Sequence, residues 1–139
     1  MTAKEFLEQI PHIDARIKAL IEQQDRHRYY ASKGTGTLSA VRYGGTADHS
    51  KVEHGALKVI ELEKQIGKLV IDLVTLKAKA LAYIDMLYDQ RQRDILTWRY
   101  LNGWEWKQVI ECLEVERMQV WRIHDTALHN VKLMIDYYQ

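Results

Sequence analysis

The sequence contains very little cysteine, proline, phenylalanine and glycine. Its 139 residues include one Cys, one Pro, one Phe and seven Gly. A single cysteine, Cys112, cannot close an intramolecular disulfide, and scarce proline and glycine leave most of the chain free to form helices. No stretch approaches the roughly 18 uncharged apolar residues that a membrane-spanning helix needs. These absences exclude a disulfide scaffold and an integral membrane protein, and they predict an almost all-α fold.

The chain also lacks an excess of either charge. Twenty Lys and Arg residues oppose nineteen Asp and Glu residues, which gives a formal net charge of +1. No global field therefore attracts nucleic acid or acidic lipid, so any basic surface must be local. A hydrophobic content of 47% excludes a disordered chain. Because no charged-then-apolar leader opens the sequence, we expect a cytoplasmic location.

Residues 1–87 carry the pattern of a long helical hairpin. Thr2 and Glu5 form a capping box that predicts a helix start, and the helix should continue to about Tyr30. Pro11 predicts a kink or a restart of the helix near Ile10. The apolar residues of this helix alternate at spacings of four and three: Phe6, Ile10, Ile13, Ile17 and Leu20.

Residues 32–49 predict a long loop, because they hold four glycines together with Ser and Thr and show no sustained period. The stretch 26–51 has five cations (Arg26, Arg28, Lys33, Arg42 and Lys51) and one acid, Asp48. Two interpretations stay open: a solvated connection that happens to be basic, or a flexible arm that contacts phosphates.

A second capping box, Ser50 with Glu53, predicts the start of a longer helix. Its apolar stripe consists of Val52, Val59, Leu62, Ile66, Leu69, Leu73, Leu76, Ala80, Tyr83 and Leu87. The first helix can return along this stripe as an antiparallel, coiled-coil-like hairpin. Because two helices bury only a narrow seam, we expect the hairpin to self-associate into a homodimer or a higher oligomer.

Residues 88–139 predict a helix-turn-helix module. Asp89 with Gln92 resembles a weaker capping box, and Asn102-Gly103 should end the apolar helix that follows. The residues from Trp106 to Asp125 supply an apolar side chain at each position that two crossed helices require: Val109, Leu113, Val115, Val120 and Ile123. Two positions depart from the pattern, since Ile110 stands where Ala or Gly is usual and Glu114 stands where Gly is usual. The segment 85–139 has seven cations and nine acids, a formal charge of −2.

The sequence offers no pattern for catalysis or for a cofactor. His124 and His129 are five residues apart, as are His49 and His54, and neither spacing places both rings on one helical face. Cys112 lies beside Glu111, which is not the electropositive setting of a nucleophilic thiol. We therefore expect no enzyme activity, no metal and no cofactor. Among the tryptophans, Trp98 is expected in the core, whereas Trp104 and Trp121 are expected to be exposed.

The run from Asp89 to Gly103, followed by Trp106–Leu113 and Val115–His124, resembles region 4 of sigma-70-type transcription factors. Together with the opening Ala3–Ile10 and the glycine-rich loop, the whole chain is similar to phage-encoded late-transcription regulators of the ArpU and RinA type. The most specific part of the resemblance is Arg117-x-Gln-Val-Trp-Arg-Ile-His124 joined to Tyr100-x-Asn-Gly103. This resemblance implies an activator in the bacterial host cytoplasm that binds double-stranded DNA near a promoter and assists host RNA polymerase.

The resemblance also implies which residues touch DNA. Helix 116–129 would read the major groove through Arg117, Met118 and Arg122, with Gln119 and Trp121 facing the backbone. Phosphate contacts would come from four further residues: Lys107, Gln108, Arg91 and Arg93. Glu105 and Glu116 stand where such proteins often carry a Ser or Thr cap. The alternative hypothesis, favoured by the net acidity of the module, is a helical interaction factor that contacts RNA polymerase or another regulator without binding DNA.

Overall fold

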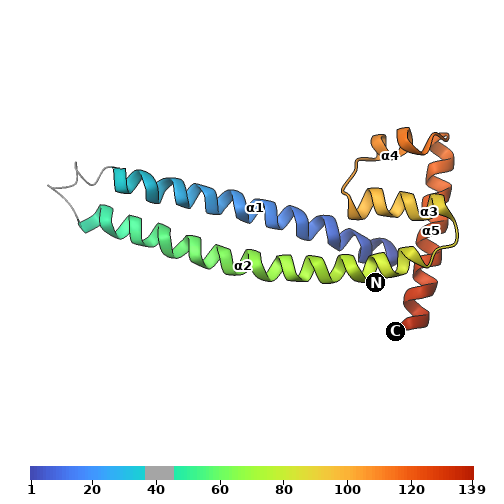
Figure 1. The fold of residues 1–139 in the computed structure, drawn as a ribbon, viewed down its shortest axis with the longest axis horizontal. Coiled ribbons are helices and arrows are strands. Elements are labelled where there is room, and N and C mark those ends of the chain that lie inside the picture. The colour runs from blue at the N-terminus through green and yellow to red at the C-terminus, as the bar shows by residue number, and fades with distance from the viewer. Residues whose placement is uncertain (37–45) are drawn as a thin grey trace. The chain divides into compact units, whose positions relative to one another are not determined.

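The computed structural model describes residues 1–36 and 46–139, with side chains for residues 1–32 and 52–139. Every described element is helical, which confirms the predicted all-α class. In chain order the elements are α1 (Ala3–Gly36), α2 (Thr46–Asp85), α3 (Gln90–Leu96), the π-helical turn η2 (Thr97–Leu101), α4 (Trp106–Leu113) and α5 (Arg117–Tyr138), shown in Figure 1. None of the described helices is both long and apolar enough to cross a membrane.

The chain forms two compact units that do not follow the order of the sequence. Residues 15–72 form the hairpin unit, and residues 1–14 together with 73–139 form the helical module. The division differs from the predicted one, 1–87 and 88–139, because both long helices contribute their other ends to the module. The first turns of α1 and the last turns of α2 are therefore part of the core that holds the C-terminal helices.

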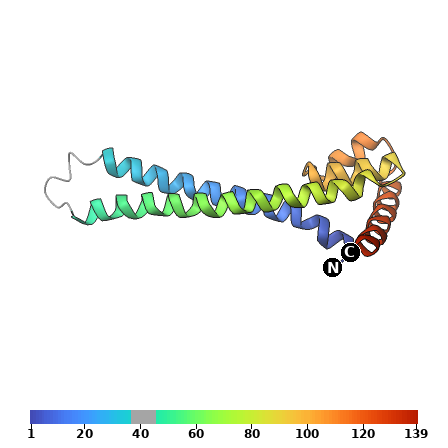
Figure 2. The ribbon, with the colours of Figure 1, turned by 60° about the horizontal axis from the view of Figure 1, so that its bottom comes forward.

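In the hairpin unit, α1 and α2 run side by side in opposite directions (Figures 1 and 2). Ile17, Leu20 and Leu62 are buried in the seam between them. The buried amide of Gln24 donates from Nε2 to the carbonyl oxygen of Val59 at 3.1 Å, which satisfies a polar group inside the seam. The predicted antiparallel hairpin is thus confirmed.

Both long helices extend further into the predicted loop than their sequence signals indicate. Helix α1 continues to Gly36, and α2 begins at Thr46, before the predicted start at Ser50. The predicted loop boundaries of 32–49 are therefore wrong at both ends. Once a helix has nucleated, each further residue adds a hydrogen bond at low entropic cost, so weak formers near its ends are recruited. Residues 37–45, including Arg42, lie outside the described residues.

The N-terminal capping box is present as predicted. The Thr2 backbone N–H donates to Glu5 Oε2 at 2.9 Å, and the Glu5 N–H donates to Thr2 Oγ1 at 3.1 Å. Helix α1 passes through Pro11 without ending, so the expected restart near Ile10 is wrong. Leu7 and Ile10 lie in the turn just before Pro11 and are 0% and 1% exposed. Their core contacts hold the helix together where proline removes a hydrogen bond.

The helical module has a dense core. Its largest fully buried side chains come from α1, α2 and each C-terminal α-helix: Leu7, Ile10, Ile84, Ile95, Leu96, Val109, Val120 and Val131.

Asp89 caps α3 by accepting from the Arg91 N–H at 2.8 Å. Gln92 does not complete the expected box, because its Oε1 accepts instead from Asn130 Nδ2 on α5 at 3.1 Å. The chain leaves η2 through Asn102 and Gly103, and Gly103 has a φ of 73°, as the stop signal predicted.

Candidate nucleic-acid interface

Helices α4 and α5 pack on α3 through one small apolar cluster. Ile95, Val109 and Val120 form its fully buried centre. Half-buried side chains surround this centre: Trp98, Trp104, Trp106, Ile110, Leu113, Val115 and Ile123. All the apolar positions predicted for the crossed helices lie in this cluster. The apolar packing predicted between these two helices is therefore present.

The two residues that depart from the helix-turn-helix pattern are accommodated in different ways. Glu114 ends α4 in the left-handed region, with φ 57° and ψ 32°, which is the conformation that glycine usually supplies at such a turn. A residue with a Cβ pays about 1 kcal/mol to adopt it. Ile110 is half-buried and packs against the central cluster. The turn therefore keeps the usual backbone path while carrying an exposed carboxylate.

The two helices begin differently. At α4, Gln108 Oε1 accepts from the Glu105 backbone N–H at 3.1 Å as part of a capping box. Gln108 was predicted to contact phosphate, but in this structure its side-chain oxygen stabilises the start of its own helix. At α5, Glu116 has an extended backbone and its side chain makes no capping hydrogen bond. The first N–H groups of α5 are consequently not capped by the residue that precedes them.

An aromatic layer supports α5 from behind. The rings of Trp106 and Trp121 meet edge to face at 4.5 Å, and Trp98 stacks on Trp104 at 5.2 Å. Arg99 places its guanidinium over the Trp106 ring at 5.0 Å and donates to the carbonyl oxygen of Trp104 at 2.9 Å. Trp104 and Trp121 are half-buried rather than exposed, because each has a second aromatic ring to pack against.

Tyr100 and His124 form a buried polar contact between η2 and α5. The Tyr100 hydroxyl and His124 Nε2 are 2.8 Å apart, and both residues are buried. Burial is the main cause that lowers the pKa of His124, and Lys4 and Arg99 lower it further while Asp125 raises it. Burial, assisted chiefly by the charge of Glu8, raises the pKa of Tyr100 to about 12.

Sequence reasoning missed this Tyr100–His124 contact, although a signal was available. The buried residues of α5 recur every three or four positions: Val120, His124, Ala127, Val131 and Ile135. His124 occupies a regular place in that stripe, which predicts that it faces the core and needs a hydrogen-bond partner. The identity of the partner depends on η2, whose π-helical geometry no sequence pattern indicated.

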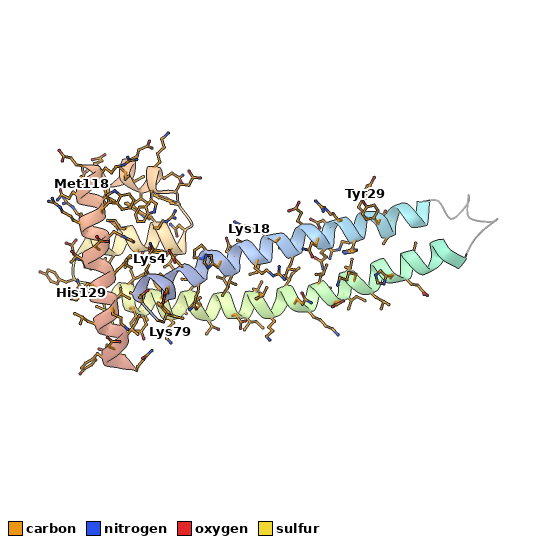
Figure 3. All side chains as sticks on the ribbon, turned by 180° about the vertical axis from the view of Figure 1, so that it is seen from behind. Lys4, Lys18, Tyr29, Lys79, Met118 and His129 are labelled. Atoms are coloured by element: carbon orange, nitrogen blue, oxygen red, sulfur yellow. The ribbon has the colours of Figure 1, made fainter. Side chains whose placement is uncertain are left out.

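The predicted reading residues are exposed in the first two turns of α5. Arg117, Met118, Gln119 and Arg122 are all exposed, and Met118 is 64% exposed. Figure 3 marks Met118 near the start of α5 and His129 further along the same helix. The exposed Asp125 is three residues after Arg122 and is therefore its neighbour on the helix surface. The first two turns of α5 therefore carry two exposed arginines, and an exposed acid lies next to the second of them.

The residues predicted to contact phosphate differ in their surroundings: some are exposed, and one forms hydrogen bonds within the chain. Lys107 and Arg91 are exposed. Arg93 is half-buried, and its guanidinium donates to the carbonyl oxygen of Leu87, to that of Tyr88 at 3.1 Å and to Gln90 Oε1 at 2.9 Å. Arg93 therefore joins the turn after α2 to α3, a structural contact that the sequence did not indicate.

Nothing among the described residues forms a metal centre or a clear ligand pocket. No group of three or more His, Cys, Asp or Glu side chains gathers in the described part of the chain. One cavity in the module, of about 480 Å³, is bordered by the aromatic layer and by both signs of charge, Lys4 and Arg99 with Glu8 and Asp125. Opposite charges on one wall favour no class of charged ligand.

No protein-family model, curated protein or solved structure matches this chain.

Proposed function

We propose that this protein is a DNA-binding transcription regulator that reads a duplex site with the N-terminal half of α5. The observation that carries the proposal is the contrast between buried and exposed side chains in the first turns of this helix. Val120 and His124 are buried in the module, whereas Arg117, Met118 and Arg122 are exposed. A rigid helix that presents arginines in its first turns has the shape and the donors needed for the major groove.

The chemistry of the exposed side chains supports direct readout. An arginine can donate two parallel hydrogen bonds to O6 and N7 of guanine, and each such contact discriminates between bases by about 1–3 kcal/mol. Lys107 on α4 and Arg91 on α3 add two exposed cations for backbone contacts.

The role implied by the resemblance is a finer part of the same proposal. The protein would act in the cytoplasm of a bacterial host, bind near a phage late promoter and contact host RNA polymerase. Exposed acids lie at and near the α4–α5 turn: Glu111, Glu114 and Glu116. These carboxylates repel phosphate, so they favour a protein partner on that side of the module.

The same acids favour a second candidate function, a helical interaction factor that contacts RNA polymerase or another regulator without touching DNA. Such a factor would keep the apolar cluster and the aromatic layer, since both stabilise the fold. Its function would not require Arg117 and Arg122 to contact DNA. The two functions therefore differ in what these arginines do.

A salt titration of duplex binding separates the two functions. Affinity of the full chain for a fluorescent duplex would be measured at several salt concentrations by anisotropy. Each phosphate contact contributes about −0.9 to the slope of log K against log salt. We expect a clear slope that the Arg117→Ala, Arg122→Ala variant reduces and that Lys107→Ala reduces by about 1.

The matched control is Arg16→Ala, which removes one exposed arginine from the hairpin unit and should leave both affinity and slope unchanged. Folding of every variant would be checked by circular dichroism. Equal loss of affinity in the Arg16→Ala control would mean that net charge alone drives binding. Absence of binding at low salt by the folded wild type would contradict the proposal and favour the interaction factor.

A further inference from the structure

Helix α2 of the hairpin unit has a second, outward stripe that no part of this chain covers among the described residues. We call Leu57, Ile60, Lys64, Gly67 and Ile71 the outer stripe. These residues alternate at spacings of three and four, as the contact face of a coiled coil does. Its three large apolar side chains are 66%, 52% and 68% exposed, in chain order. Along the sequence the same spacing continues at Val74, Ala78 and Leu81.

The outer stripe is distinct from the seam that α2 makes with α1. Val59, Leu62, Ile66 and Leu69 are buried or half-buried in that seam. Each lies one or two positions away from an outer-stripe residue, so the two stripes occupy different faces of one helix. Apolar side chains on both faces indicate contact with a partner on each side, and α1 provides only one.

Gly67 is a second observation that points to a close partner. It lies in the middle of α2, where glycine is less favourable than alanine because it loses more backbone entropy on folding. A Cβ placed on Gly67 would meet nothing within 4 Å. The chain itself therefore gives no packing reason for glycine here. A neighbouring helix that approaches the backbone closely would give one.

The charges beside the outer stripe fit a second copy of the same helix running in the opposite direction. With a twofold axis between positions 65 and 66, Ile60 lies opposite Ile71 of the second copy, and Lys64 lies opposite Gly67 of the second copy. Glu61 and Lys68 flank the stripe on the same side, one residue after Ile60 and Gly67. In this register Glu61 meets Lys68 of the second copy, and the symmetry produces the pair twice.

The antiparallel register agrees with the other features of the stripe. A parallel pair would place Lys64 against the same lysine of the partner, whereas the antiparallel pair lays its long side chain over a glycine. Within the chain Glu61 contacts Lys58 at 3.4 Å. That pair is solvent-exposed and holds the carboxylate weakly, so Glu61 is able to turn toward the partner.

We infer that the outer stripe binds a second copy of this chain as an antiparallel helix pair centred between residues 65 and 66. This surface is on a different unit from the exposed arginines of α5, so the inference does not rest on DNA binding. Its test uses no DNA, and either proposal can fail while the other stands.

Disulfide crosslinking between two single-cysteine variants tests the register directly. In a Cys112→Ser background, Ile60→Cys and Ile71→Cys would be prepared separately, mixed, oxidised and resolved by mass. We expect a 60–71 crosslink in the mixture and little crosslinked product from either variant alone. In the proposed register, position 60 lies about 16 Å along the axis from position 60 of the second copy.

Three results would overturn the inference. The first is a monomer by sedimentation at about 100 µM, a concentration at which even a weak dimer would form. The second is crosslinking of Ile60→Cys with itself, which would mean parallel helices, and the third is a dimer in which the mixed variants do not crosslink. Because cysteine replaces isoleucine at an exposed site in each variant, loss of fold is not expected to obscure the result.

Charge exchange provides a second measurement on the full chain. Lys68→Glu reverses one member of both symmetric pairs and should weaken dimerisation by about tenfold. The Glu61→Lys, Lys68→Glu double variant should restore the wild-type dissociation constant. Restoration by Glu63→Lys, Lys68→Glu instead would contradict the antiparallel register, because that pair meets only in parallel helices.

Gly67→Ala gives the sharpest single substitution, because its two expected effects have opposite signs. Alanine favours the helix, so slower hydrogen exchange in α2 is expected under dilute, monomeric conditions. The added methyl group stands where the partner helix approaches, so a weaker dimer is expected at high concentration. Equal or stronger dimerisation of Gly67→Ala would contradict a close approach at this position.

Discussion

The hairpin unit and the helical module share the two long helices α1 and α2, yet they bury their apolar side chains very differently. In the module, helices on several sides enclose Ile95, Leu96 and Val120, which have no exposed surface. In the hairpin unit, two helices close over Leu20 and Leu62 and leave Leu57 and Ile71 more than 60% exposed. Burial is limited by the number of surrounding elements, and a lone helix pair offers too few.

This difference assigns different tasks to the two units. The module supplies a rigid back for α5, so that its exposed arginines keep a fixed direction. Rigid support is what a reading helix needs, since base contacts depend on geometry to a fraction of an ångström. The hairpin unit keeps an exposed apolar stripe, which contributes stability only when a partner buries it. The account therefore predicts that the module tolerates core changes poorly and that the hairpin tolerates them better.

The largest expected effect comes from truncating one core residue in each unit. Ile95→Ala leaves a cavity that fully packed neighbours cannot close, and it should cost about 4 kcal/mol. Leu62→Ala lies in a seam with solvent on both sides and should cost about 2 kcal/mol, the low end for such substitutions. Amide hydrogen exchange reports each unit separately, α4 and α5 for the first variant and α1 and α2 for the second. Equal losses would erase the proposed difference between the two cores.

A smaller effect separates two arginines that the sequence treats alike. Arg93→Ala removes the donor to the carbonyl groups of Leu87 and Tyr88 and should destabilise the module by about 2 kcal/mol. Arg91→Ala, its matched control, removes an exposed guanidinium two residues away and should change stability by less than about 0.5 kcal/mol. Thermal unfolding measures both. If Arg91→Ala were the more destabilising variant, the structural role of Arg93 would be refuted.

The turn between α4 and α5 should give an effect of about 1 kcal/mol. Glu114→Gly relieves the left-handed backbone of a residue with a Cβ and should raise the free energy of unfolding by that amount. Glu114→Ala removes the same charge but keeps the Cβ, so it should give no such gain. Chemical denaturation distinguishes the two variants. A similar gain in both would show that charge, rather than backbone conformation, limits stability at this turn.

The smallest expected effect is a pH dependence specific to the module. The lowered pKa of His124 means that the unfolded chain binds a proton more readily than the folded chain does. The contribution of His124 is therefore complete above its ordinary pKa of 6.5 and is lost as the pH falls below that value. Tyr100, with a pKa raised to about 12, contributes the opposite slope between pH 10 and 12, where only the unfolded chain loses its proton.

Thermal melts of wild type and His124→Gln between about pH 5 and pH 7.5 test this linkage. Glutamine does not titrate, so the variant should be less stable at neutral pH and should lose less stability on acidification. Tyr100→Phe serves as a control for the hydrogen bond, since it leaves the histidine buried and titratable. Parallel curves for wild type and His124→Gln would show that His124 does not set the acid slope.

The parts of this fold that follow from local spacing could be predicted from sequence. The seam of α2, the cap at Thr2 and the apolar positions Val109 and Val120 all depend on residues within a few turns of one another. The roles of Arg93 and Trp121 could not be predicted in this way. Arg93 reaches carbonyl groups that are brought to it by the turn after α2, and Trp121 is covered by a ring on another helix. Such contacts depend on how helices meet, which spacing does not encode.

The helix ends and the outer stripe illustrate a different limit. Capping boxes indicate where a helix is able to start, but α2 begins before Ser50 because extension of an existing helix costs little. The outer stripe is present in the sequence as a second three-four alternation. Only the burial pattern shows that it lies on a different face of α2 from the seam. The exposure of Leu57 and Ile71 supplies that information.

Selection of duplexes from a random library by the full chain tests the central claim most directly. The enriched sequences would be measured again with the Arg117→Ala, Arg122→Ala variant. The account predicts an enriched motif containing guanine positions, which the variant no longer distinguishes from random duplex although it remains folded. Failure of folded wild-type protein to enrich any sequence, or an identical motif from the variant, would contradict readout by α5.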